Sequence, residues 1–158
     1  MTYMVPLITW LPLVYLIYKN RVFLLQFRID LSITLNIIGV IFLGIGTILH
    51  IWTGLLLGLW ELIGLPEIST KIKGRLVAEG PFSMVRHPTY LAHTLMFSGI
   101  FLITEVVSVG IITLLDFILI NSLIIPLEEK ELSSRFGEDY KQYKKKVPRF
   151  FPSIRLKE

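Results

Sequence analysis

Apolar and charged positions divide the chain into long apolar runs separated by short charged segments. Three of the runs contain no Lys, Arg, Asp or Glu, and a fourth contains only Asp116. Runs of this length and hydrophobicity are typical of transmembrane helices. The pattern therefore predicts an all-α, polytopic helical membrane protein with about four transmembrane spans. The predicted spans are residues 2–18, 31–60, 88–104 and 106–127.

The second run is longer than a simple crossing requires. As one straight helix, residues 31–60 would measure about 45 Å, whereas the hydrocarbon core is about 30 Å thick. Glycines within this run offer places to bend and to approach neighbouring helices closely. Gly54 and Gly58 have the small-xxx-small spacing of helix-packing motifs. We expect this segment to tilt, bend or emerge from the bilayer.

The polar segment after the fourth run also has helical periodicity. Apolar and aromatic side chains recur there at intervals of three or four residues, which predicts a C-terminal amphipathic helix. Its apolar face would lie on the membrane or over a site. A glycine at position 137 is expected to interrupt this helix. The residues of the apolar face are Leu132, Phe136, Tyr140, Tyr143 and Val147.

Composition agrees with a membrane protein and narrows the class of partner. The chain is 53% hydrophobic and 18% charged, which lies outside the usual balance of a soluble domain. It has no cysteine, so disulfides and Cys-ligated metals are excluded. In a membrane protein, a net charge of +4 indicates an anionic lipid surface rather than nucleic acid. We expect one membrane domain over residues 1–158, contact with membrane lipids, and neither a nucleic-acid partner nor a metal.

The distribution of basic residues predicts the orientation. Of the 16 Lys and Arg residues, three lie in the first connection, four in the second and nine in the tail after the fourth run. Because Lys and Arg favour cytoplasmic segments, the prediction is an integral, multi-pass protein with a cytoplasmic active-site face and C-terminal tail, residues 128–158. The turn at Glu105 would lie outside. The three basic residues of the first connection would also lie outside, so a missing or extra crossing near the N-terminus is an alternative.

A group of polar residues opens the third span. Pro88 suits the first turn of a helix, so the span begins there. The free N–H groups and partial positive charge of a helix start, together with Arg86, make a natural anion site. Arg86, Tyr90, His93 and Phe97 fall on one stripe of this helix. Each residue alone is equally well explained as an interfacial anchor, but the group together favours a site.

Acidic residues follow the fourth span. With four spans, Glu128, Glu129 and Glu131 leave the bilayer on the same side as Arg86 and His87. Taken alone, such a cluster is more simply explained as a solvent-exposed helix face, stabilised by ion pairs between residues one turn apart. Its position opposite the basic helix start favours the second half of a site.

These elements resemble the isoprenylcysteine carboxyl methyltransferase family, to which the phospholipid N-methyltransferases are related. The resemblance covers roughly residues 74–152, about half of the chain. It implies methyl transfer from S-adenosylmethionine at a membrane-embedded site without a Rossmann fold, and the sequence has no glycine-rich strand-to-helix loop. The matching motifs are Gly80-Pro81-Phe82, Arg86-His87-Pro88-Thr89-Tyr90, an apolar helical hairpin, Glu128-Glu129, Phe136-Gly137-Glu138-Asp139-Tyr140, Val147-Pro148-Arg149 and Pro152.

The resemblance also implies roles for individual residues. Glu128 and Glu129 would close the cofactor pocket from one side. Arg149 and Glu128 are the candidate catalytic residues, with Arg149 orienting an anionic acceptor; a lipid-headgroup anchor is an equally good interpretation of Arg149. The other side of the cofactor pocket would be lined by Leu76, Val77, Gly80, Arg86, His87, Pro88, Tyr90 and His93.

The favoured acceptor is the carboxylate of a prenylated cysteine or a similar lipid-like small molecule. A carboxylate is ionised near neutral pH and needs no general base, whereas an amine would have to lose a proton. Phospholipid N-methylation is the alternative, and a non-enzymatic membrane adaptor or transport subunit is a more distant one. The apolar residues 123–127 stand where family members often carry basic residues, which bears on the acceptor. Asp116 is left without a role, with His50 as a candidate partner.

Overall fold

The computed structural model describes residues 12, 14–62 and 75–150. Apart from an isolated β-bridge between Arg28 and Val106, the regular structure of these residues is helical, which confirms the all-α prediction. Most of the predicted first span, residues 2–18, lies outside them. The helices are α2 (Arg21–Leu25), α3 (Ile33–Leu62), α5 (Pro81–Met84), α6 (Pro88–Thr104), α7 (Val107–Leu119), the π-helix η1 (Ile120–Ile124), α8 (Ile125–Phe136) and α9 (Glu138–Lys146).

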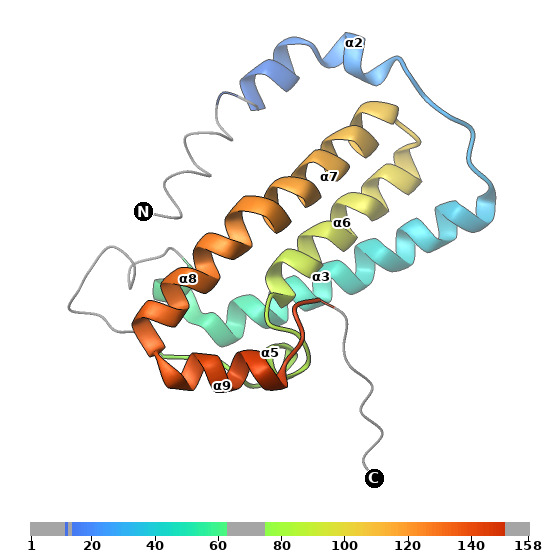
Figure 1. Cartoon of the computed structure of the whole chain (residues 1–158). Helices are drawn as coiled ribbons and strands as arrows, with labels where there is room; N and C mark the ends of the chain where they lie inside the picture. The colour runs from blue at the N-terminus through green and yellow to red at the C-terminus, as the bar shows by residue number, and fades with distance from the viewer. Residues whose placement is uncertain (1–11, 13, 63–74, 151–158) are drawn as a thin grey trace.

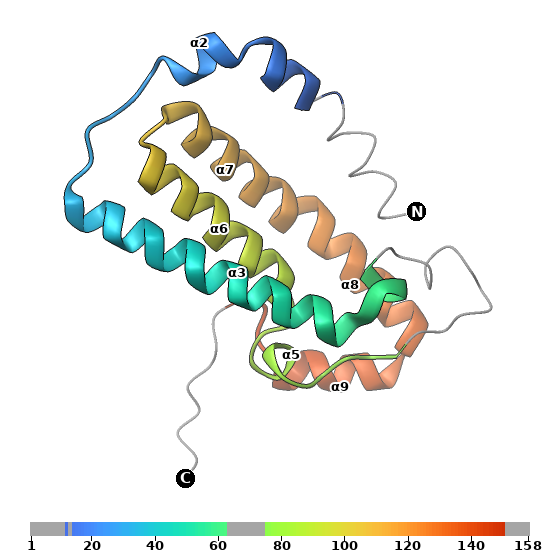
Figure 2. The same ribbon diagram turned by 180° about the vertical axis from the view of Figure 1, so that it is seen from behind.

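Three long helices form the body of the molecule. The central helix α6 packs against α3 on one side and α7 on the other, so the three lie side by side (Figure 1). Helix α8 continues the line of α7. Helix α2 lies across one end of this layer, whereas α5 and α9 lie at the opposite end, as the view from behind also shows (Figure 2). We call the end with α5 and α9 the polar end, because it carries the charged residues described below.

Two helical stretches are long and apolar enough to cross a membrane, Ile33–Gly58 and Val107–Phe136. Their outer faces carry exposed side chains such as Leu55 and Leu114, as expected for helices that face lipid. Helix α6 matches the predicted third span in its bounds and has 17 residues. This is about 26 Å, slightly less than a hydrocarbon core of about 30 Å. The four-span topology and its orientation stay predictions.

The close contact between α3 and α6 depends on glycines. A Cβ atom on Gly99 would lie 2.6 Å from the carbonyl oxygen of Gly39, and one on Gly46 would lie 2.8 Å from that of Ala92. The two backbones therefore approach more closely than a larger residue allows. Gly54 does not contribute to a close helix contact, since a Cβ there would have no neighbour within 4 Å in the described part of the chain.

Helix α3 bends near its end, which is one of the three outcomes expected from its length. Gly58 has φ 77° and ψ 165°, a conformation outside the helical region. Positive φ is accessible to glycine at little cost, because it has no Cβ atom. The end of α3 turns at this point (Figure 2).

The turn between α6 and α7 is tied to the chain that precedes α3. Glu105 ends α6 with a left-handed φ of 61°. Its carboxylate accepts hydrogen bonds from the N–H of Leu31 at 3.4 Å and from Nδ2 of Asn36 at 3.2 Å. The N–H of Ile29 also donates to the backbone carbonyl of Glu105. The first connection and this turn thus lie at the same end of the layer, as the spans predicted.

A π-helical turn separates α7 from α8. Pro126, two residues after this turn, lacks an N–H group, and its ring would clash with the carbonyl four residues before it in a regular helix. The wider turn of η1 accommodates this proline without ending the helix. The helix therefore continues from apolar residues into Glu128 and Glu129, which it presents at the polar end.

Candidate active site

Helix α9 turns back across the polar end and covers it. Gly137, with φ 55°, separates α8 from α9, as the sequence predicted. Tyr140 and Tyr143 on the inner face of α9 form a buried cluster with Val147, the residue after the helix, which confirms the predicted apolar face. This face packs against protein rather than lipid. The partly buried residues that surround the cluster are Leu76, Leu132 and Phe136.

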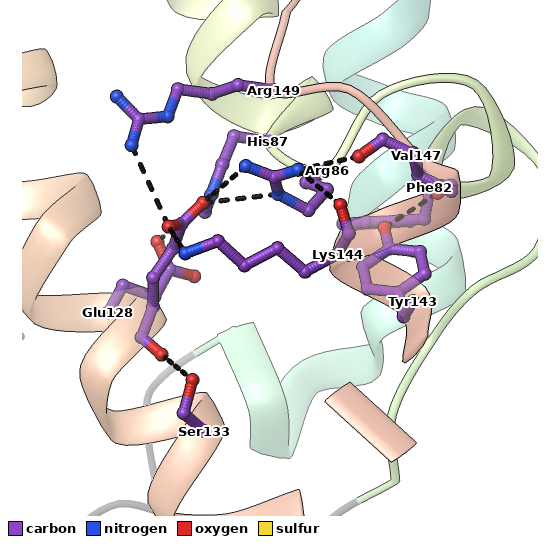
Figure 3. Close-up of polar contacts among 10 residues, drawn as sticks. Phe82, Arg86, His87, Glu128, Ser133, Tyr143, Lys144, Val147 and Arg149 are labelled. Atoms are coloured by element: carbon purple, nitrogen blue, oxygen red, sulfur yellow. Dashed lines mark hydrogen bonds and ion pairs between the residues drawn. The ribbon is translucent and has the colours of Figure 1, made fainter. Parts of the chain in front are cut away.

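Glu129 is the centre of the polar end, and it is only 5% exposed. Its Oε1 accepts hydrogen bonds from Arg86 Nη2 at 2.8 Å and Nε at 3.1 Å, and lies 3.3 Å from His87 Nε2. Its Oε2 accepts one from Lys144 Nζ at 2.6 Å and lies 3.7 Å from Arg149 Nη2. These side chains come from the segment just before α6, from α8, from α9 and from the segment after α9 (Figure 3). Together with Glu128, we call these residues the polar site.

Arg86 is engaged by protein on every side, and its side chain is 9% exposed. Besides the bonds to Glu129, Nη1 donates to the carbonyl oxygens of Lys144 at 3.1 Å and Val147 at 2.6 Å. The backbone N–H of Arg86 donates to the carbonyl of Pro148 at 2.8 Å. Arg86 therefore fastens α9 to the start of α6. A carboxylate of the chain itself, that of Glu129, thus lies at this helix start, and contact of Arg86 with a cofactor stays a prediction.

The neighbouring charges shift two pKa values in opposite directions. Burial alone raises the pKa of Glu129, but the bonds from His87, Lys144 and Arg86 outweigh it and hold this pKa well below its ordinary value. Burial lowers the pKa of His87, but its interactions with Glu128 and Glu129 outweigh this and raise it above 6.5. By linkage, His87 stabilises the fold below pH 6.5, and this contribution is lost as pH rises through its folded-state pKa.

Glu128 differs from Glu129 in having an oxygen atom without a hydrogen-bond donor. Its buried Oε2 lies 3.5 Å from His87 Nδ1 and forms no hydrogen bond within the described part of the chain. This ion pair is longer than a normal hydrogen bond, so it offsets only part of the cost of burying the oxygen. An N–H or O–H group of a bound molecule would remove this cost.

Four of the predicted pocket residues support the polar site from neighbouring segments. Leu76 packs against the tyrosine cluster of α9, and Val77 is buried. Gly80 has φ 57°, and a Cβ there would lie 2.8 Å from Leu56 Cδ1 on α3. Pro88 is the first residue of α6 and is fully buried. Their contacts with a cofactor stay predictions.

Tyr90 and His93 continue along α6 below the charged residues. The ring of Tyr90 lies 5.9 Å from that of His87. The ring of His93 lies 4.8 Å from that of His50 on α3. His50 therefore has His93 as a neighbour, and Asp116, buried on α7, joins no ion pair within the described residues.

Two residues at the polar end were missed from the sequence. Lys144 lies one turn after Tyr140, at the edge of the inner face of α9, so the helical spacing contained a signal for it. Phe150 follows α9, and its ring lies 6.5 Å from that of His87 and 6.4 Å from that of Phe117 on α7. The chain after α9 thus returns to the helical layer.

The buried tyrosines of α9 allow a matched test of stability. Tyr143 donates its hydroxyl to the carbonyl of Phe82 at 2.6 Å, whereas the hydroxyl of Tyr140, 1% exposed, has no partner within the described residues. Tyr143→Phe should cost about 1–2 kcal/mol, and Tyr140→Phe should be neutral or stabilising. Thermal unfolding in detergent measures both. A larger loss for Tyr140→Phe would contradict this assignment.

Comparison with known proteins gives the chain a family. The model of the family described as phospholipid methyltransferase matches residues 34–139. The cobalt-zinc-cadmium resistance protein CzcN of Cupriavidus metallidurans is 31% identical over 126 residues, which is 80% of this chain and 51% of that protein. The nickel-cobalt-cadmium resistance protein NccN of Alcaligenes xylosoxydans xylosoxydans is 29% identical, over 80% of this chain and 54% of that protein.

A further relative agrees with the resemblance found in the motifs. The protein-S-isoprenylcysteine O-methyltransferase of Schizosaccharomyces pombe is 36% identical over 83 residues, 50% of this chain and 34% of that protein. The chain spans about half the length of the two resistance proteins. No solved structure shows significant similarity to it. Because the family match covers residues 34–139, from α3 into α9, this chain belongs to the phospholipid methyltransferase family.

Proposed function

We propose that the protein is a membrane-bound methyltransferase that uses S-adenosylmethionine and methylates a lipid-like acceptor. The first choice of acceptor is the carboxylate of a prenylated cysteine. The observation that carries this proposal is the polar site itself, a group of converging charges at the end of long apolar helices. Such a site can hold charged groups of a cofactor while lipid-facing helices offer apolar surface to an acceptor chain.

The residues of the polar end suit this cofactor. Glu128 Oε2, buried without a donor, would accept a hydrogen bond from the cofactor's ammonium or ribose hydroxyl groups. Leu76 and Val77 offer apolar surface to the adenine ring. Tyr90 offers a ring face, which attracts cations, and His93 lies one turn further along α6. When bound, this cofactor supplies a methyl group activated by a positively charged sulfur.

The main catalytic task of the chain is to hold and orient the acceptor. An acceptor carboxylate is already ionised near neutral pH, so no residue has to remove a proton. Arg149, whose side chain is 39% exposed, can bind such a carboxylate. The exposed apolar side chains of α3 and α7 can contact its lipid chain.

Two alternatives each rest on a separate observation. The family description names phospholipids, and an amine headgroup would have to lose a proton before methylation. Two of the relatives are named for metal resistance, which favours a non-enzymatic role in a membrane assembly. Binding of S-adenosylmethionine to the purified protein separates the enzymatic from the non-enzymatic class.

The acceptor is tested with the intact chain in lipid nanodiscs and methyl-labelled cofactor. The three acceptors are a short prenyl-cysteine, the same cysteine without its prenyl group, and phosphatidylethanolamine. We expect an alkali-labile label on the prenylated compound alone, since each buried chain carbon is worth about 0.8 kcal/mol. The acceptor carboxylate does not change its charge from about pH 6 to 9, so any change of rate in this range should follow the titration of His87, whose pKa is raised above 6.5.

Each other outcome has a defined meaning. Label in the phospholipid headgroup would favour the amine alternative. Equal labelling of the cysteine without its prenyl group would contradict a lipid-like acceptor. A protein that binds no cofactor would contradict the enzymatic proposal as a whole.

A further inference from the structure

The polar site carries more positive than negative charge. Arg86, Lys144 and Arg149 each form an ion pair with Glu129, and Glu128 is the second carboxylate of this group. The three permanent cations therefore exceed the two carboxylates by one positive charge, and His87 adds another when it is protonated. An excess of this kind attracts an anion to the site.

Arg86 has at most one of its five N–H donors left for a ligand. Its Nε and Nη2 donate to Glu129, and its Nη1 donates to the carbonyls of Lys144 and Val147. With all three nitrogens engaged and little of the side chain exposed, Arg86 serves to fasten α9 in place.

Lys144 and Arg149 have hydrogen-bond donors to spare. The ammonium of Lys144 has three donors, one of which is used on Glu129, and the side chain is 47% exposed. Arg149 lies 3.7 Å from Glu129, which is longer than a hydrogen bond. Within the described residues its side chain forms no hydrogen bond. Both side chains lie beside the same oxygen, Oε2 of Glu129, so one anion can reach both.

We propose that Lys144 and Arg149 form a carboxylate-binding subsite, with Glu129 holding the two cations in position. A carboxylate has two oxygens that can bind the ammonium and the guanidinium together. This inference rests on the proposed function, since a methyltransferase of this kind offers two carboxylates, one on the amino-acid part of S-adenosylmethionine and one on the acceptor. Lys144 is thus a binding residue for one of these ligands.

The test compares Lys144→Met with Lys145→Met in the intact chain in lipid nanodiscs. Lys145 is the next residue of α9 and is exposed, so this control removes the same charge from the same helix. One experiment measures the affinities for S-adenosylmethionine and for 5′-methylthioadenosine, which lacks the amino-acid part. A second measures KM for the prenyl-cysteine.

Lys144→Met should weaken binding of one carboxylate ligand about tenfold or more, because a charge-assisted contact is lost. If that ligand is the cofactor, 5′-methylthioadenosine should bind as before; if it is the acceptor, KM should rise while cofactor affinity is kept. Lys144→Arg should restore most of the loss in either case. Unchanged affinity and KM in Lys144→Met, or equal losses in Lys145→Met, would overturn the subsite. Failure of the proposed function is distinct, since wild-type protein would then bind no cofactor.

Discussion

Glu129→Ala is expected to lower the free energy of unfolding by about 3–5 kcal/mol, as for other broken buried ion pairs. The carboxylate binds Arg86 at 2.8 Å and Lys144 at 2.6 Å. Without it, the guanidinium of Arg86 is left buried with no opposite charge beside it, and α9 loses its link to α8. Chemical unfolding in detergent measures the loss of stability. Hydrogen exchange of the α9 amides, expected to quicken, measures the release of this helix.

Glu138→Ala is the control, because it also removes a glutamate carboxylate from an ion pair, but at the surface of the protein. Glu138 pairs with Lys141 at 2.6 Å, and its side chain is 74% exposed, so the loss should be below about 1 kcal/mol. Equal losses in the two variants would contradict the central role of Glu129. Because its folded-state pKa is lowered, Glu129 stabilises the fold above its ordinary pKa of 4.5. The difference between wild type and Glu129→Ala should therefore shrink as pH falls below that value.

The bounds of the helices could be predicted where the sequence marks them with particular residues. Helix α6 begins at Pro88 and ends before Glu105, as the apolar run between them predicted. The interruption at Gly137 was also predicted from its residue type. The π-helical turn before Pro126 was not predicted, because it depends on how a helix relieves one steric clash, which hydrophobic periodicity does not record.

The sequence predicted which residues belong to the polar site better than which of them bind one another. Motif order brought Arg86, His87 and Glu129 into one group before any geometry was known. Helical spacing identifies neighbours on one helix, but it cannot tell which residues of different helices meet. That four of the five N–H donors of Arg86 would bind within the chain, and that Lys144 would share Glu129 with it, depended on the path of α9 across the polar end.

The glycines of α3 also show that sequence spacing does not identify contacts between helices. The contact between α3 and α6 predicts a large loss of stability in Gly99→Ala. Gly39 and Gly46 were among the glycines predicted to allow close approach, and the contact with α6 uses them, whereas the small-xxx-small spacing singled out Gly54 and Gly58. A Cβ on Gly99 of α6 would lie 2.6 Å from the oxygen of Gly39 and 2.7 Å from a backbone nitrogen of α3. Backbone atoms cannot yield without separating the helices. Gly99→Ala should therefore cost about 1–3 kcal/mol, the usual range for overpacking.

Gly44→Ala provides the opposite expectation within the same pair of helices. A Cβ at Gly44 would have no neighbour within 4 Å, and alanine favours the helix over glycine by about 1 kcal/mol. The two substitutions add the same methyl group but should change stability with opposite signs. Thermal unfolding of both variants in one detergent measures the difference. If Gly99→Ala were as stable as Gly44→Ala, α3 and α6 would have to be farther apart than this packing allows, and the layer that carries the polar site would need a different arrangement.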